Sequence, residues 1–141
     1  MPIFTDTSAL FALLIPGDQY HDQAANVARQ ILREREPLWT IDAVIVELWR
    51  LLRSERGRNT ADDLVQNLAS GGLDIQPSAR EDYTRAWHLA LEWPNQDFAL
   101  VDRLAFAAIE RARSFRAWSY DADFAVIRLG PTRNRALDLL L

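Results

Sequence analysis

The first fourteen residues constrain the fold more than any other stretch of this chain. They are typical of a short apolar strand that contains Phe4, ends at the carboxylate of Asp6, and continues through two hydroxyl residues into an apolar helix over residues 9–14. Side chains alternate along a strand, so Phe4 and Asp6 point to the same side. In open α/β sheets, ligands bind beyond the carboxyl ends of the strands. The segment therefore predicts either a helix cap at Asp6 or a carboxylate at the edge of a ligand site.

The composition is that of one ordinary soluble domain. The chain has 141 residues, 49% of them hydrophobic and 26% charged, and it is long enough to bury a substantial core. We therefore expect a single domain over residues 1–141. The absence of cysteine excludes disulfides and thiolate metal sites. The first residues do not resemble a signal peptide, and no apolar run is long enough to span a bilayer, so we expect a cytoplasmic protein without a membrane partner.

The basic residues are unusual because all 16 are Arg and none is Lys. The net charge of −4 argues against a nucleic-acid partner, unless several acids line one metal site. The absence of Lys excludes a P-loop and Schiff-base chemistry. The planar guanidinium of Arg is well suited to phosphate. Three arginines on one side of a predicted helix, Arg50, Arg53 and Arg56, are therefore candidate RNA contacts together with Arg58 just beyond them. Ordinary solvated charge is the alternative.

Apolar periodicity predicts strands that alternate with helices. Strands are expected over residues 38–41, 73–76, 115–119 and 136–139, and helices over 18–36, 43–56, 60–70, 79–91 and 98–113. This alternation indicates an α/β fold with a parallel sheet between helices. Two capping boxes are expected, one at residues 60–63 and one at residues 78–81. The helix after the second box is expected to bury the apolar stripe Tyr83, Ala86, Trp87, Ala90 and Leu91.

Four carboxylates occupy unusual positions. Asp6 and Asp121 each follow a predicted strand, while Glu47 and Asp102 each interrupt the apolar face of a helix. The alternatives are an ion pair of Glu47 with Arg50 and helix-dipole compensation at Asp102. In a parallel sheet, two strand ends and the adjacent helices can converge on one crevice, where clustered carboxylates repel one another unless cations are bound. Oxygen ligands alone favour Mg²⁺ or Mn²⁺, ions that suit phosphodiester hydrolysis.

Four segments in this order resemble the PIN domain, and in particular the small stand-alone PIN toxins of VapBC-type toxin–antitoxin pairs. They are Asp-Thr-Ser-Ala at 6–9, Thr-Ile-Asp-Ala-Val-Ile-Val-Glu-Leu at 40–48, Asp-Phe-Ala-Leu-Val-Asp at 97–102 and Ser-Tyr-Asp-Ala-Asp-Phe at 119–124. The resemblance covers nearly the whole chain. It implies a three-layer α/β fold with a central parallel sheet flanked by helices. It also implies a Mg²⁺/Mn²⁺-dependent endoribonuclease, the toxin of a type II toxin–antitoxin pair.

The resemblance also implies the site residues and the partners. The acids of the family fall on Asp6, Glu47, Asp102 and Asp121, and whether Asp121 or Asp123 is the fourth acid stays open. Its hydroxyl residues fall on Ser8 and Ser119, although the family usually has Thr at the second position. The implied partners are an RNA substrate, a cognate antitoxin protein and a second copy of the chain in a homodimer. We expect the antitoxin to lie in a groove lined by the first helices, with Trp93 as a candidate contact.

Two other functions are compatible with the sequence. One is a non-catalytic PIN-fold module that binds RNA or serves as a scaffold, although a scaffold has no need for four clustered acids. The other is an acid-pocket phosphotransfer domain, which the missing Lys and the lack of a second Asp just after Asp6 disfavour. Binding of Mn²⁺ with measurable stabilisation would distinguish an enzyme from a scaffold.

Overall fold

A computed structural model describes residues 1–140 and confirms the expected α/β fold. Within these residues, five strands form one parallel sheet in the order β3-β2-β1-β4-β5. The strands are β1 (Ile3–Thr5), β2 (Leu38–Ile41), β3 (Asp74–Gln76), β4 (Arg116–Trp118) and β5 (Asp138–Leu140). The helices are α1 (Thr7–Leu14), α2 (His21–Glu34), α3 (Asp42–Arg56), α4 (Arg58–Ser70), α5 (Arg80–Glu92), α6 (Leu100–Ala112) and α7 (Asp123–Val126). None of these helices is long and apolar enough to cross a membrane.

The strand order places a topological switch point between β1 and β4. From β1 the chain builds outward to β2 and β3, then returns to add β4 and β5 on the other side of β1. At such a point the connections leave the two central strands in opposite directions and open a crevice at their carboxyl ends. The residues that directly follow β1 and β4 are Asp6 and Ser119. The topology alone therefore brings these two segments together at the position where α/β proteins bind ligands.

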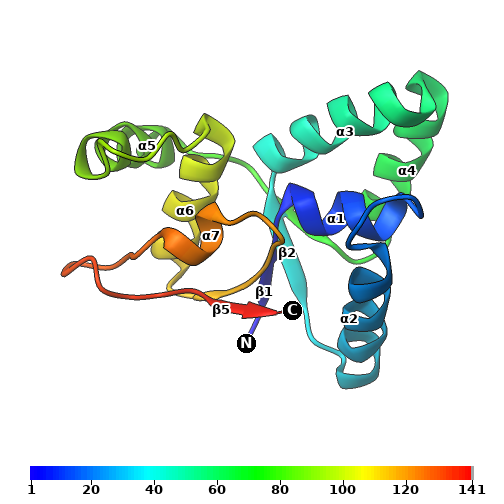
Figure 1. Cartoon of the computed structure of the whole chain (residues 1–141), viewed down its shortest axis with the longest axis horizontal. Coiled ribbons are helices and arrows are strands. Elements are labelled where there is room, and N and C mark those ends of the chain that lie inside the picture. The colour runs from blue at the N-terminus through cyan, green and yellow to red at the C-terminus, as the bar shows by residue number, and fades with distance from the viewer. Residues whose placement is uncertain (141) are drawn as a thin grey trace.

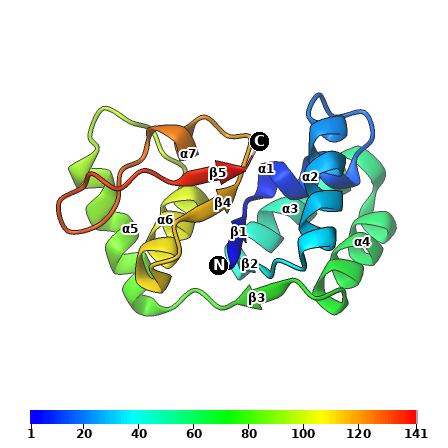
Figure 2. The same cartoon turned by 90° about the horizontal axis from the view of Figure 1, so that it is seen from below.

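Alternation along the strands divides the core between the two faces of the sheet. On β1, Phe4 belongs to a large cluster with side chains of α3 and α6, and Ile3 belongs to a smaller cluster with α2. On β4, Ala117 and Trp118 divide in the same way. Figure 1 shows the resulting arrangement, with the α3–α4 pair and the α5–α6 pair on opposite sides of the molecule. Figure 2 shows the same separation from below.

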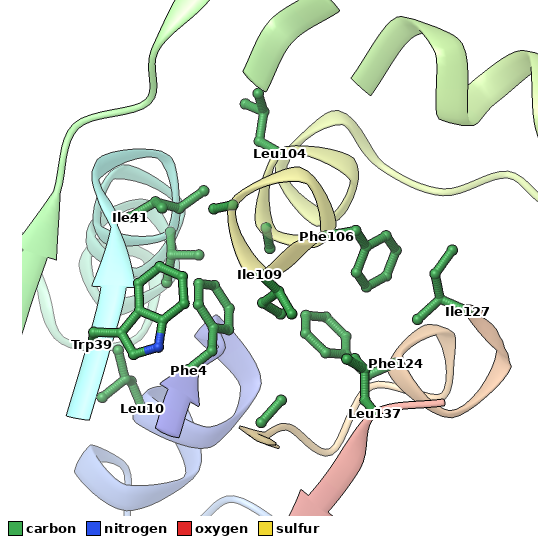
Figure 3. Close-up of a cluster of buried hydrophobic side chains, with 14 of the residues drawn as sticks. Phe4, Leu10, Trp39, Ile41, Leu104, Phe106, Ile109, Phe124, Ile127 and Leu137 are labelled. Atoms are coloured by element: carbon green, nitrogen blue, oxygen red, sulfur yellow. The ribbon is translucent and has the colours of Figure 1, made fainter. Parts of the chain in front are cut away.

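A chain of aromatic rings in the larger cluster fixes α7 against the sheet. Phe124 is fully buried on α7. Its ring lies 6.3 Å from that of Phe4 on β1 and 4.9 Å from that of Phe106 on α6, between ring centroids. Figure 3 shows these three rings in contact across the core. Phe124 therefore holds the loop that carries Asp121 and Asp123 in a defined position.

Most of the predicted apolar stripe of α5 faces solvent, so its predicted burial is wrong except at Ala86. Tyr83, Trp87 and Leu91 are 40%, 51% and 77% exposed, while Ala86 and Leu89 are fully buried. The rotation of α5 is set by buried Asp82. Its carboxylate accepts hydrogen bonds from the amide of Ala79 (3.0 Å) and from Arg111 on α6 (2.9 Å).

Both predicted capping boxes are also wrong. Helix α5 has Ala79 at its N-cap position, and Ser78 instead donates through its amide and its hydroxyl to Asp42. Helix α4 begins at Arg58, two residues earlier than expected. The reason is Gly57, whose φ of +85° is accessible to glycine without steric cost and lets the chain reverse directly from α3 into α4.

Candidate active site

The Asp6 carboxylate lies buried at the end of β1 and is held by two serine hydroxyls. Ser8 Oγ donates to Oδ2 of Asp6 at 2.8 Å, and Ser119 Oγ donates to the same oxygen at 2.9 Å. One serine comes from α1 and the other from the loop after β4. Because both hydroxyls bind Oδ2, the serines leave Oδ1 available to another ligand. Asp6 also caps α1, since its side chain accepts from the Ser8 amide, which confirms the predicted helix cap.

The two serines also fix the loop after β4. Ser8 Oγ accepts a hydrogen bond from the amide of Tyr120 at 2.9 Å, and Ser119 Oγ accepts one from the amide of Asp121 at 3.0 Å. Asp121 in turn accepts a bond from the amide of Asp123 at 2.9 Å. Each hydroxyl therefore donates a hydrogen bond to Asp6 and accepts one from a backbone amide of the loop. The network links the first acid of the chain to the last two.

Three carboxylates form the tightest group of acids among the described residues. One oxygen each from Asp102, Asp121 and Asp123 lies within 4.8 Å of the other two. Asp102 is buried in the first turn of α6, and the other two are half-buried. Asp121 and Asp123 therefore both belong to the cluster, and the geometry does not force a choice between them.

Burial and the charges of neighbouring acids act most strongly on Asp102. Burial raises the pKa of Asp102 to about 8, with further contributions from the charges of Asp6, Asp121, Glu47 and Asp123. Burial also raises the pKa of Asp6, against the opposing effect of its two serine donors. The pKa of Asp123 is raised by burial and by the charge of Asp121. Without a cation, the protein therefore holds more negative charge in one place than the site can easily accommodate.

Glu47 lies at the border of the cluster. It is half-buried on the second turn of α3, and its charge raises the pKa of Asp102. It is not part of the tight group of three acids. The alternative ion pair with Arg50 is absent from residues 1–140, so Glu47 faces the acids without a basic partner on its own helix.

The donor set fits a hard divalent cation. It consists of carboxylate oxygens, which Mg²⁺ and Mn²⁺ prefer. Neither cysteine nor histidine joins the group in the described residues. An ion bound there would offset the repulsion that raises the pKa of Asp102.

The candidate RNA-contacting arginines do not form a single set. Arg50, Arg53 and Arg56 are all exposed on α3. Arg53 and Arg56 line a pocket at the α3–α4 junction together with Arg58, and Arg50 does not line it. The sequence suggested Arg58 as part of this basic group, but the pocket itself depends on the early start of α4 after Gly57, which the sequence did not predict. Trp93, a candidate partner contact, is half-buried with its ring 6.1 Å from that of Phe98.

Three solved structures illustrate proteins with the same fold. VapC20 of Mycobacterium tuberculosis, described as a sarcin-ricin loop cleaving toxin, is 24% identical with a TM-score of 0.77 over 88% of this chain and 93% of that one. VapBC2 of Rickettsia felis, bound to a DNA fragment from its promoter, is 12% identical with a TM-score of 0.74 over 100% of both chains. A toxin–antitoxin complex from Klebsiella pneumoniae is 17% identical, with a TM-score of 0.63 over 99% of this chain and 96% of that one.

Sequence comparison identifies the family. No curated protein sequence matches the chain. The family model described as "PIN domain" matches residues 3–129. This range contains all five acids of the site, Asp6, Glu47, Asp102, Asp121 and Asp123. The chain therefore belongs to the PIN-domain family.

Proposed function

We propose that this chain is a Mg²⁺- or Mn²⁺-dependent endoribonuclease that acts as the toxin of a type II toxin–antitoxin pair. The observation that carries this proposal is the convergence of five acids at the switch point of the sheet. Burial, together with the charges of the other four acids, raises the pKa of Asp102 to about 8. Such an arrangement is costly in the metal-free protein and favourable only when it binds cations. The sarcin-ricin loop cleavage by VapC20 supports RNA as the substrate class.

In this proposal the residues divide into two groups. Asp102, Asp121 and Asp123 hold the ion, with Asp6 and Glu47 completing the negative site. A bound ion would polarise the scissile phosphate, lower the pKa of a water molecule and neutralise the leaving oxygen. Ser8 and Ser119 fix the orientation of the Asp6 carboxylate through Oδ2. They are positioning residues and do not touch the substrate.

Cleavage of RNA by the purified chain tests the function. We expect products with Mg²⁺ or Mn²⁺ and none with EDTA. Asp6→Asn, Glu47→Gln and Asp102→Asn should each abolish cleavage while keeping the fold, and the matched control Asp63→Asn removes an exposed acid of α4 without effect. Mapping RNA ends in cells that express the wild type or the Asp6→Asn variant would then identify the target. Full activity in any of the three site variants would refute its assignment.

An apolar groove suits the proposed antitoxin. It has a volume of about 580 Å³ between α1, α2 and α4 and is lined mainly by aliphatic side chains, among them Leu13, Leu14, Ile31, Leu32, Leu64 and Leu68. Leu32 is 76% exposed there. An amphipathic segment could bury its apolar face in this groove, as expected from the sequence for the first helices. Toxin–antitoxin complexes among the solved structures of this fold support the partner class.

Metal titration distinguishes two ways in which an antitoxin could inhibit. An Arg or Lys of the partner could pair with Asp6 or Asp102 and displace the ion by charge. The toxin should be co-purified with the protein encoded next to it and titrated with Mn²⁺. We expect weaker Mn²⁺ binding by the complex than by the free toxin. Equal affinity would exclude displacement by charge and leave steric blocking.

The exposed stripe of α5 suits a homodimer interface. Tyr83, Trp87 and Leu91 follow one another at intervals of four residues, so they lie on one side of the helix. Large exposed apolar patches on soluble proteins usually mark interaction surfaces. We propose that a second copy of the chain covers this stripe, and the molar mass in solution tests the proposal.

A further inference from the structure

A pocket at the junction of α3 and α4 is lined by polar and basic residues without any acid. It has a volume of about 580 Å³, and its lining residues are Arg53, Arg56, Gly57, Arg58, Asn59 and Thr60. Within residues 1–140, none of the three guanidinium groups has an ion pair or a hydrogen bond. Three free arginines around one pocket are unexpected in a protein with a net charge of −4, where acidic partners are abundant.

The pocket is preorganised by the fold of the two helices. Gly57, at a φ of +85°, ends α3 and starts α4 within one residue, so the last arginines of one helix meet the first residues of the other. Trp49 on α3 donates a hydrogen bond through Nε1 to Asp62 on α4 at 2.7 Å. The guanidinium of Arg53 lies 6.0 Å from the centroid of the same Trp49 ring. These contacts hold the helices together without involving Arg56 or Arg58.

Interaction with the helix dipoles accounts for only two of the three arginines. Arg53 and Arg56 lie in the last turn of α3, where a positive charge interacts favourably with the helix dipole. Arg58 is the first residue of α4, where the dipole disfavours a positive charge. The Gly57 cap also has no side chain to bind the first amides of α4. The free amides and the three guanidinium groups thus point to an anionic ligand with several acceptor oxygens.

We propose that this pocket binds a backbone phosphate of single-stranded RNA, several nucleotides away from the phosphate at the acid cluster. The inference rests on the proposed ribonuclease function and adds a second substrate contact to it. Arg56 lies nine residues after Glu47 on the same helix, which is about 14 Å along the axis at 1.5 Å per residue. That distance corresponds to roughly four nucleotides at 3.4 Å per nucleotide of a stacked strand, and to fewer in an extended strand. The guanidinium fork of Arg matches phosphate oxygens in two parallel hydrogen bonds.

RNA length provides the test. Binding is measured by fluorescence anisotropy on the Asp102→Asn protein, so that the RNA stays intact, with one oligonucleotide of about twelve nucleotides and one of about three. Arg56→Ala/Arg58→Ala should weaken binding of the long RNA about tenfold or more and leave binding of the short RNA unchanged. The slope of log affinity against log salt should become shallower by about 0.7, the contribution of one phosphate contact in a single strand.

Two control variants separate the pocket from general charge. Arg33→Ala/Arg133→Ala removes two exposed arginines that lie outside the pocket and should change the affinity for the long RNA less than twofold. Arg56→Lys/Arg58→Lys keeps the charge but loses the fork, and should bind with intermediate affinity. Equal weakening by both alanine pairs, or equal weakening for both RNA lengths, would overturn the proposal.

Free inorganic phosphate is an alternative ligand that would make the same contacts with the pocket. Stabilisation of the wild type by inorganic phosphate, together with no effect of the alanine pair on the long RNA, would assign the pocket to a small anion and overturn the RNA contact. The inference and the proposed function fail separately. Absence of RNA cleavage by the wild type with Mg²⁺ or Mn²⁺ would refute the function. Cleavage by a protein whose RNA affinity does not depend on Arg56 and Arg58 would refute only the pocket.

Discussion

At the scale of single residues, the raised pKa of Asp102 makes the stability of the metal-free protein depend on pH. Its pKa in the folded protein is about 8, against an ordinary value of 3.8. Between these two values the folded protein keeps a proton that the unfolded chain has lost. The resulting stabilisation is complete below pH 3.8 and is lost as the pH rises towards 8. A bound cation would reverse this preference by favouring the ionised carboxylate.

Removing the charge of Asp102 should therefore remove this pH dependence. We expect metal-free Asp102→Asn to match the wild type at acidic pH and to exceed it increasingly up to about pH 8. The gain should reach a few kcal/mol, since one unit of pKa corresponds to about 1.36 kcal/mol. Melting temperatures of both proteins in EDTA from pH 4 to pH 9 would measure it. Parallel curves for the two proteins would contradict the elevated pKa, and added Mn²⁺ should raise the melting temperature of the wild type only.

The two serines provide a second prediction for single residues. Ser8→Ala and Ser119→Ala each remove one donor to Asp6 and one acceptor from the following loop. We expect each to lower the rate of RNA cleavage about 10- to 100-fold, the usual effect of losing a group that orients a metal ligand. Ser119→Thr keeps the hydroxyl and should retain most activity, and Ser70→Ala, at the exposed end of α4, is the control. An inactive Ser119→Thr variant would indicate a steric role for the residue.

At the scale of elements, Gly57 determines how α3 and α4 meet. Its φ of +85° strains any other residue, although the space around its Cα is open. We expect Gly57→Ala to lower the free energy of unfolding by about 1 kcal/mol, and to weaken binding of long RNA as well, because the pocket residues would no longer face one another. Gly17→Ala is the matched control, since that position is equally open and has no positive φ. Urea titration of both variants measures the difference, and equal stability would show that the junction tolerates another backbone conformation.

The same elements show what the sequence predicted and what it did not. Short apolar runs correctly predicted the five strands of residues 1–140, among which β1, β2 and β4 are largely buried and β3 and β5 are partly exposed. These runs could not predict the rotation of α5, which depends on the pairing of Asp82 with Arg111 on another helix. The apolar period of Tyr83, Trp87 and Leu91 was real, yet it describes a face that remains partly exposed in residues 1–140. Periodicity thus identifies an apolar face but not its partner.

At the scale of the whole molecule, the site is a consequence of strand order. Asp6 and Asp121 are 115 positions apart in sequence, and Ser119 links them by hydrogen bonds because β4 returns to lie beside β1. Sequence reasoning reached this cluster by noting that acids follow strands and interrupt apolar helices. It could not separate the tight group of three acids from Asp6 and Glu47, because that depends on the loop that Ser8, Ser119 and Phe124 hold in place.

The two apolar surfaces of the molecule should have different occupants. Helix α5, which carries the exposed stripe, lies on the opposite side of the structure from α1, α2 and α4, which line the groove, as Figures 1 and 2 show for the helices. We expect Leu91→Glu to convert a dimer into a monomer, because a buried charge without a partner is costly, and to leave antitoxin binding intact. Leu32→Glu should do the opposite, abolishing co-purification of the antitoxin without changing the molar mass of the toxin. Light scattering of the free toxin and pull-down of the pair measure both effects. Loss of both properties in either variant would mean that one surface serves both partners, and a wild-type toxin that is monomeric would refute the dimer.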